Sequence, residues 1–380
     1  MWPSPYASLM RAGHVPYRDF LIEYPPLAAP VFWAPRLVTH TIVAYRVAFA
    51  LEIFLFDLLG AAVALWALAR FAPRTPSWGV VLAQPLWLIW AGRSLVFDRF
   101  DLAPAVLMLL AITLFADRRA RLAWLVLGLA TALKVYPLVV APLFVLAAWK
   151  RRTPRQAAAD AGAFAAALVV PSLIVARGDL VAVALFLKYH LDRGLEIETV
   201  YAAALMIGRV AGQPVSQTWG HGGNEIVAPL AALVSSLTLP LTVLALGAVY
   251  RVAWRRRHGW ADTPALVDDL ARLSAAATLA FMLAGKVLSP QYLLWLYPLL
   301  PLLGRRPLRA WAAFGVALLL TAWIFPAHYY QLVLFKPREI GVLMARNVLL
   351  LALGAILLAP GAPACGQAPS AEECDARARC

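Results

Sequence analysis

The sequence predicts an all-α polytopic membrane protein. Hydrophobic residues make up 62% of the 380 residues and charged residues only 14%, so polar side chains are too few to cover a water-soluble fold. Several apolar runs reach the roughly 18 residues with which a helix crosses about 30 Å of hydrocarbon. The runs are continuous, whereas strands of an outer-membrane barrel alternate apolar and polar residues.

The apolar runs divide the chain into about eleven expected transmembrane or re-entrant helices. Several are shorter than a full crossing, so they must tilt, extend into their flanks or end where protein covers the backbone. In order, the expected helices occupy residues 42–69, 78–92, 102–116, 122–136, 137–149, 157–176, 226–250, 273–286, 292–304, 310–325 and 341–360.

Basic residues predict which helix ends face the cytoplasm, because Lys and Arg are retained inside during insertion. They are densest in segments that lie inside if the N-terminus lies outside. The net charge of +14 therefore arises from topology signals, and no nucleic-acid partner is indicated. The expected inside segments are residues 70–76, 117–121, 150–155, 251–272, 305–309 and the tail from 361.

The expected organisation has three parts. Residues 1–41 form part of a first external loop, and residues 42–360 form the transmembrane core with a long external loop at 177–225. Residues 361–380 are small and polar, and we expect a disordered cytoplasmic tail. The three cysteines lie in that tail without metal-site spacing, so no metal or cofactor is expected.

An external N-terminal loop needs a helix or an export signal to carry it across the membrane. Residues 1–13, MWPSPYASLMRAG, have neither the basic start nor the apolar core of such a signal. We therefore expect that a first transmembrane helix is missing and that a complete version has about twelve.

Non-basic polar residues gather on the predicted external side. In RSLVFDRFDLAP, residues 93–104, Arg99 and Asp101 come just before a helix. Two interpretations stay open there: Asp101 caps the helix, or the segment forms a phosphate or sugar site. Lys134 lies between two apolar runs, where a lysine is costly unless it reaches the interface or an anion, which favours a function.

The long external loop carries a second polar group, KYHLDRGLEIETVYA at residues 188–202. A loop of this length is more often functional than idle, although a solvated charged surface is the alternative. Part of it, DLVAVALFLKYH, is expected to form an amphipathic helix on the membrane surface. The candidate phosphate ligands are Lys188, His190 and Arg193, and the candidate sugar ligands are Glu196 and Glu198.

A third group interrupts apolar sequence in GKVLSPQYLLWLYPLLP, residues 285–301. A proline-broken helix with Lys286 and Gln291 at the break is suited to hold an anion at the next helix start, where backbone N–H groups are free. The alternative is a simple hairpin between spans. Farther along, the basic side chains that could contribute or merely anchor at the interface are His328, Lys336, Arg338 and Arg346.

Familiar catalytic motifs are missing from the sequence. It contains no Walker motif, G-x-G-x-x-G, H-E-x-x-H or G-x-S-x-G. Nucleotide-driven chemistry, nicotinamide binding and zinc proteolysis are thereby disfavoured. A substrate that carries phosphate and lipid without a nucleotide accounts for both the external basic residues and the apolar helices.

Five motifs, in order over roughly residues 6–350, resemble the polyprenyl-phosphate-mannose-dependent mannosyltransferases of glycosyltransferase family 87, also called domain of unknown function 2029. Each motif alone is weak, but five in sequence with the expected hydropathy are fairly specific. They are GHVPYRDFLIEYPPL (13–27), DRFDLAPAVL (98–107), ALKVYPL (132–138), YHLDRGLEIET (189–199) and GKVLSPQYLLWLYPL (285–299).

The resemblance implies a GT-C type fold in the bacterial plasma membrane, with the active site on the extracytoplasmic face. Such enzymes move a sugar, here expected to be mannose, from a polyprenyl-phosphate carrier to a glycolipid or cell-envelope glycan, with inversion at the anomeric carbon. That chemistry needs a base for the acceptor hydroxyl, cations for the departing phosphate and a groove for the prenyl chain.

The resemblance also implies roles for individual residues. The base of the family is an aspartate early in the first external loop, but nothing acidic precedes Asp19 here, so we expect little activity unless Asp19 or Glu23 substitutes. The expected ligands of the donor phosphate are Lys134, Lys286, His190, Arg193 and Arg99. The expected ligands of the sugar or acceptor are Asp101, Glu198, Gln291 and Tyr292.

Two other classes of function stay open. A transporter or flippase of lipid-linked sugars would be expected to show repeat symmetry and sites near the bilayer midplane, and the sequence indicates neither. A catalytically inactive relative that acts as an assembly partner is the third hypothesis, because the early aspartate is missing.

Overall fold

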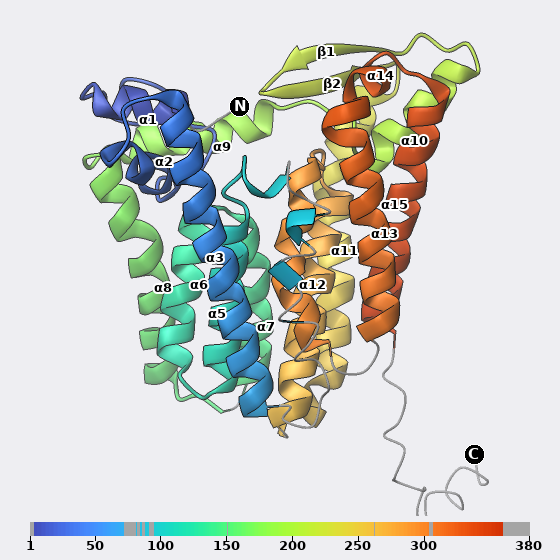
Figure 1. Ribbon diagram of the computed structural model, residues 1–380. Coiled ribbons are helices and arrows are strands. Elements are labelled where there is room, and N and C mark those ends of the chain that lie inside the picture. The colour runs from blue at the N-terminus through green and yellow to red at the C-terminus, as the bar shows by residue number, and fades with distance from the viewer. Residues whose placement is uncertain are drawn as a thin grey trace, which may run out of the picture.

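The computed structural model describes residues 4–71, 95–149, 151–261, 263–303 and 307–359, together with a few positions between 81 and 90. Long helices stand side by side in a bundle (Figure 1). Short helices and a two-stranded antiparallel hairpin cover one end of the bundle, drawn at the top. We call this the hairpin end.

The first three helices are α1 (Ser4–Arg11), α2 (Ala28–Leu37) and α3 (Ile42–Phe71). The loop between α1 and α2 is braced internally, because the Tyr17 hydroxyl donates to the Tyr24 carbonyl oxygen at 2.5 Å. Pro25 and Pro26 follow, and consecutive prolines fix φ and exclude helix before α2 begins. The loop thus holds Glu23 in a defined place at the hairpin end.

The next group consists of α5 (Leu102–Ala116), α6 (Ala120–Leu133), the 3₁₀ helix η1 (Tyr136–Val140), α7 (Ala141–Ala148) and α8 (Pro154–Val175). Gly128 allows α6 to approach α8, since a Cβ there would lie 2.5 Å from the Phe164 carbonyl oxygen. Helix α6 ends where Lys134 adopts extended φ/ψ angles, and Pro137 follows. Lys134 therefore lies at a break between two helices.

The hairpin end is built from α9 (Leu180–Asp192), α10 (Val200–Val210) and strands β1 (Ser216–Gly220) and β2 (Gly223–Val227). The two-residue turn of the hairpin has positive φ at both His221 and Gly222, as a type I′ turn requires. The segment before α10 pairs with β2, because Ile197 N–H donates to the Asn224 carbonyl at 2.9 Å. This pairing fixes Glu196 and Glu198 beside the hairpin.

The C-terminal half completes the bundle, and its helices share one hydrophobic core with α3, α5 and α6. Its elements are α11 (Ala231–Arg256), η2 (Arg257–Ala261), α12 (Thr263–Ala284), the 3₁₀ helices η3 (Pro290–Trp295) and η4 (Tyr297–Leu302), α13 (Pro307–Trp323), the π-helical turn η5 (Ile324–His328), α14 (Tyr329–Val333) and α15 (Pro337–Leu358). Prolines recur through η3 and η4, and each removes a backbone donor, so this stretch forms short 3₁₀ turns instead of one α-helix.

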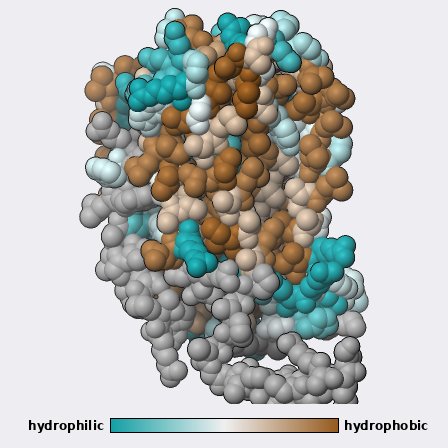
Figure 2. All heavy atoms as spheres, turned by 90° about the vertical axis from the view of Figure 1, so that its right-hand side faces the viewer, coloured by the Kyte–Doolittle hydropathy of each residue, from teal (hydrophilic) through white to brown (hydrophobic). Residues whose placement is uncertain are grey.

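Among the residues that the structure describes, five helices are long and apolar enough to cross a membrane: Ile42–Phe71, Pro154–Val175, Ala231–Trp260, Leu308–Val333 and Pro337–Leu358. Figure 2 shows a broad hydrophobic surface between hydrophilic groups near both ends. Shorter apolar helices, such as Leu102–Ala116 and Ala120–Leu133, pack among the long ones. The predicted all-α, multi-pass membrane protein is thus confirmed in class, whereas the expected number of about eleven spans is not.

Several expectations can be compared with the helices directly. The segment expected to form an amphipathic surface helix is helical in α9, which lies across the hairpin end (Figure 1). The span expected at residues 292–304 is instead made largely of η3 and η4. Most of the span expected at 78–92 and all of the tail 361–380 lie outside the described residues.

Candidate active site

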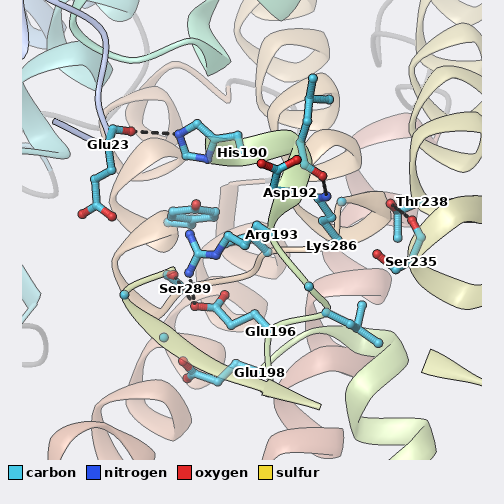
Figure 3. Close-up of a pocket in the computed structure, with 18 of the residues that line it drawn as sticks. Glu23, His190, Asp192, Arg193, Glu196, Glu198, Ser235, Thr238, Lys286 and Ser289 are labelled. Atoms are coloured by element: carbon cyan, nitrogen blue, oxygen red, sulfur yellow. Dashed lines mark hydrogen bonds and ion pairs between the residues drawn. The ribbon is translucent and has the colours of Figure 1, made fainter. Parts of the chain in front are cut away.

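A cavity of about 1270 Å³ opens at the hairpin end. Its lining comes from the loop before α2, the break after α6, the end of α9, the hairpin, α11 and the break after α12. Figure 3 shows that charged side chains from the loop before α2, from the end of α9 and the segment after it, and from the break after α12 face a common space. The charged lining residues are Glu23, Asp98, Arg99, Lys134, His190, Asp192, Arg193, Glu196, Glu198 and Lys286.

Lys134 is held by a carboxylate and by aromatic rings. Its ammonium nitrogen lies 2.6 Å from Asp101 Oδ1, and the same oxygen accepts a hydrogen bond of 2.7 Å from Trp295 Nε1. Four ring centroids lie 5.2 to 5.3 Å from that ammonium, within reach of cation–π attraction. The rings belong to Tyr24, Phe100, Tyr292 and Trp295.

Asp101 has a different role from the two that its position suggested. Its side chain makes no capping hydrogen bond to α5, so the capping interpretation is wrong. It is only 1% exposed and is not part of the cavity lining, so the structure does not bring it to a sugar either. Asp101 instead neutralises Lys134 and fixes its side chain at the cavity wall.

Glu23 faces the cavity from the loop before α2 (Figure 3). Its Oε2 accepts a hydrogen bond of 2.9 Å from the Tyr189 hydroxyl, and His190 Nε2 lies 2.9 Å from its backbone carbonyl oxygen. Both partners belong to α9, 166 and 167 residues away in sequence. Helix α9 therefore orients the Glu23 carboxylate.

Asp19 lies in the same loop but not in the cavity lining. Its carboxylate accepts hydrogen bonds from the Val15 backbone N–H at 2.7 Å and from Arg18 at 2.9 Å. The Arg18 guanidinium and the Val15 N–H lower the pKa of Asp19 to about 2. Of the two carboxylates expected to act as base, only Glu23 reaches the cavity.

Glu196 occupies the place where the sequence suggested a bound anion. Its Oε2 accepts from the backbone N–H of Leu288 at 2.8 Å, and its Oε1 accepts from the Ser289 hydroxyl at 2.8 Å. Arg193 lies 3.3 Å from Oε1. The anion expected at the start of the helix after Lys286 is thus replaced there by a carboxylate of the chain itself.

Glu198 lines the cavity two residues farther on and is only 2% exposed. Its backbone carbonyl oxygen accepts a hydrogen bond of 2.9 Å from Arg346 Nη2. Burial, and then the neighbouring charge of Glu196, raise the pKa of the Glu198 carboxyl above its ordinary value. Buried carboxyl groups with a raised pKa in a cavity are typical of functional sites.

The basic side chains complete the electrostatics of the cavity. Arg193 is 8% exposed, and its Nε has no hydrogen-bond partner among the described residues. The Lys286 ammonium donates to the Leu191 carbonyl oxygen at 2.7 Å. Burial lowers the pKa of both Lys286 and His190. These donors can meet a ligand that carries negative charge.

Comparison with protein families adds a decisive observation. The model of glycosyltransferase family 87 matches residues 20–290, which is more than half of the chain. The chain belongs to glycosyltransferase family 87. The match begins just before Glu23 and includes Lys134, Arg193 and Lys286 of the cavity. The family 87 chain is therefore a multi-pass membrane glycosyltransferase, with a sugar donor and an acceptor as substrates. A search of curated protein sequences gave no match.

Most of the residues expected from the family 87 motifs meet at one cavity. The donor-phosphate candidates Lys134, Lys286, His190, Arg193 and Arg99 all line it, as do the sugar candidates Glu198, Gln291 and Tyr292. Lys188 lies away from it and pairs with Asp192 on the exposed face of α9. Arg346, considered as an interface anchor, is only 1% exposed and cannot serve as one.

Sequence reasoning missed one wall of the family 87 cavity, which α11 forms. Ser235 and Thr238 face the cavity on the side opposite Glu23 (Figure 3). The hydroxyl of Thr238 donates to the Ser235 carbonyl, and that of Thr242 donates to the Thr238 carbonyl, each at 2.7 Å. Because these hydroxyls are satisfied within the helix, this wall of the cavity is only weakly polar. Ser235, Thr238 and Thr242 are three and four residues apart, which places them on one face of a helix, and this spacing was the sequence signal that could have identified the wall.

The motifs also contain an aromatic stack whose role the sequence did not predict. Trp295 stacks between Tyr136 and Tyr292, with ring centroids 3.9 and 3.8 Å apart. The stack lines the cavity beside the Asp101–Lys134 pair, to which Trp295 is hydrogen-bonded. For metal ions, no group of three His, Cys, Asp or Glu side chains converges within the described ranges of this family 87 chain.

Proposed function

We propose that this glycosyltransferase transfers mannose from a polyprenyl-phosphate carrier to a hydroxyl group of a glycolipid or cell-envelope glycan. The observation that supports it best is the division of one cavity: Glu23 stands on one side, and the cations Arg193 and Lys286 stand toward the other (Figure 3). A base and a phosphate site must face the same sugar from different sides if the anomeric carbon is inverted.

Glu23 is the proposed general base. Its carboxylate would accept the proton of the acceptor hydroxyl while that oxygen bonds to the anomeric carbon and the bond from that carbon to the phosphate oxygen breaks. The Tyr189 hydroxyl holds one oxygen of this carboxylate in place at the cavity. The leaving polyprenyl phosphate carries away the bonding electron pair and the additional negative charge.

Cations on the cavity wall would stabilise that charge. Lys134 is fixed by Asp101 and the surrounding rings, so little reorganisation is needed when the phosphate departs. Arg193 has an unpartnered Nε within the described chain, and Lys286 donates only to a backbone carbonyl. His190 and Arg99 extend this basic lining. Glu198, Gln291 and Tyr292 are proposed to bind sugar or acceptor hydroxyls.

The α11 wall supports a lipid carrier. Its small residues continue from the charged part of the cavity along a helix that is apolar enough to span the membrane. Leu239 is 68% exposed and lines the same space, which favours contact with hydrocarbon rather than water. A prenyl chain along this wall would leave its phosphate near Lys286.

The distribution of charge supports an extracytoplasmic active face in a GT-C type fold. The cavity lies at the hairpin end, whereas the basic loops next to Arg119 and Arg152 lie at the opposite end of the bundle (Figure 1). Lys and Arg in loops mark the cytoplasmic side. The bacterial plasma membrane is the proposed location.

A transfer assay tests the function. Membranes containing the chain would receive radiolabelled polyprenyl-phosphate-mannose and glycolipid extract, and labelled product would be counted. We expect transfer by the wild type and a loss of about 100-fold or more in E23Q, as removal of a general base causes. D117N, at the far end of the bundle, is the matched control and should stay within about twofold of the wild-type rate.

Three outcomes would contradict parts of this proposal. Absence of transfer by the wild type with all polyprenyl-phosphate sugars would refute the reaction. Movement of the donor across the membrane without transfer would favour a flippase. Loss of activity in D19N but not in E23Q would move the base to Asp19.

A further inference from the structure

Arg346 is a buried cation with unsatisfied donors. It lies on α15, is 1% exposed, and donates from Nη2 to the Glu198 carbonyl oxygen at 2.9 Å. Its Nε and Nη1 have no hydrogen-bond partner in the part of the chain that the structure describes. Burying a guanidinium in this way is costly unless its charge acts on a nearby group.

Two carboxylates, those of Glu198 and Glu196, act electrostatically on Arg346. Glu196 accepts hydrogen bonds from Leu288 and Ser289 and pairs with Arg193, so its oxygens are engaged. Glu198 lines the cavity, and Arg346 contacts its backbone carbonyl from the side away from the cavity lining. The charge of Arg346 therefore lies next to a residue whose carboxyl group lines the cavity.

We propose that Arg346 is a positioning residue whose buried charge controls the ionisation of Glu198 in the cavity. The guanidinium does this from behind the wall, because Arg346 is not part of the cavity lining. The inference rests on the proposed function only in so far as Glu198 binds a sugar or acceptor hydroxyl. An ionised Glu198 accepts a hydrogen bond from such a hydroxyl, whereas a protonated one can donate.

Charged and titratable groups face Glu198 from four elements. Glu196, in the same segment, and burial raise the pKa of Glu198, while Arg346 on α15 and Arg99 before α5 lower it. Tyr329 on α14 faces it as well, and its hydroxyl accepts a hydrogen bond of 3.2 Å from Asn224. Without Arg346, burial and Glu196 would still raise the pKa of Glu198, and mainly Arg99 would oppose them.

Asn347 supplies a matched control. It is 3% exposed, is the next residue on α15, and its side-chain amide lies 3.4 Å from the Thr199 carbonyl oxygen. Arg346 and Asn347 thus contact consecutive backbone carbonyls of the same loop, but only Arg346 carries charge. A change in pH dependence that is caused by lost packing should occur when either Arg346 or Asn347 is replaced. A change that is caused by lost charge should occur only when Arg346 is replaced.

The first experiment measures transfer of label from polyprenyl-phosphate-mannose between pH 5 and 9. E198Q identifies the limb of the pH profile that belongs to Glu198, because that limb disappears. We expect the limb to move to higher pH by about one unit or more in R346Q, as loss of a nearby opposite charge does, and to return in R346K. N347A should keep the wild-type profile. An unmoved limb in R346Q would overturn the proposal.

The second experiment needs no activity, so it separates this inference from the proposed reaction. Thermal unfolding of purified protein in detergent is followed across the same pH range. Because the folded-state pKa of Glu198 is raised, its stability contribution is present at low pH and lost as pH rises through that pKa. R346Q should shift this loss to higher pH, and E198Q/R346Q should show no shift relative to E198Q.

Two results of the unfolding experiment would decide against Arg346. Equal shifts of the pH dependence in R346Q and N347A would indicate packing rather than charge. The same R346Q shift with and without Glu198 would assign the charge effect to another group. If R346Q does not fold, R346M, which also removes the charge, takes its place in the same comparison with wild type, E198Q and N347A.

Discussion

The ammonium nitrogen of Lys134 lies 2.6 Å from Asp101 Oδ1, across 33 residues of sequence. Asp101 is almost completely buried, and Trp295 donates to the same oxygen at 2.7 Å. The pair converts a lysine in apolar sequence into a fixed cation at the wall of the cavity. Its stability and its function are therefore coupled, which gives a first prediction.

D101N should destabilise the protein by about 3 to 5 kcal/mol, because it leaves the buried Lys134 ammonium without its counter-ion. The melting temperature in detergent measures the loss. D192N is the control, since Asp192 pairs with Lys188 at an exposed site, where such pairs contribute about 1 kcal/mol or less. Equal effects of D101N and D192N would contradict the view that the buried Lys134 needs Asp101 as its counter-ion.

E196Q should cost more stability than S289A. The glutamine keeps only one acceptor oxygen, so it cannot serve both the Leu288 N–H and the Ser289 hydroxyl, and it loses the Arg193 ion pair. Hydrogen bonds to a charged group contribute about 1.5 to 3 kcal/mol each, whereas S289A removes only one. Denaturation midpoints of the two variants measure the difference. If E196Q lowers the midpoint less than S289A does, the Glu196 carboxylate is not the anion that stabilises the chain break at Leu288 and Ser289.

S235W should narrow the cavity along α11 and reduce transfer from a long-chain polyprenyl donor by about tenfold or more, roughly 1.4 kcal/mol. A donor with a short, water-soluble chain should be affected far less. V243W is the matched control, because Val243 lies on the same helix, is 62% exposed and does not line the cavity. Equal loss with both donors would argue against a lipid path on this wall.

Acidification should weaken the contact between α9 and the first loop through His190. Burial lowers the folded-state pKa of His190 below 6.5, so its contribution to stability is present above pH 6.5 and lost as pH falls through the lowered value. The fall in melting temperature between pH 7 and 5 should be smaller in H190Q. H40Q, at an exposed histidine, should retain the wild-type fall. An unchanged pH dependence in H190Q would contradict this role.

The sequence predicted much of the site because its motifs occur at helix breaks and in loops, where chain composition changes visibly. Lys134 and Lys286 stand out against apolar surroundings, and both line the cavity. The same reasoning could not rank Asp19 against Glu23. Only the contacts of Glu23 with Tyr189 and His190, more than 160 residues away, bring its loop to the cavity.

Sequence alone determined the class of the molecule: apolar runs, prolines and clusters of Lys and Arg are local properties, and a membrane helix forms largely from its own residues. Tertiary structure decided which charged side chains are engaged by other residues of the chain and which face the cavity. Glu196 is occupied by Leu288, 92 residues away, and Arg346 reaches the backbone of Glu198 across 148 residues. Burial and partners set the charge and bonding of such groups, and neither can be read from neighbours in sequence.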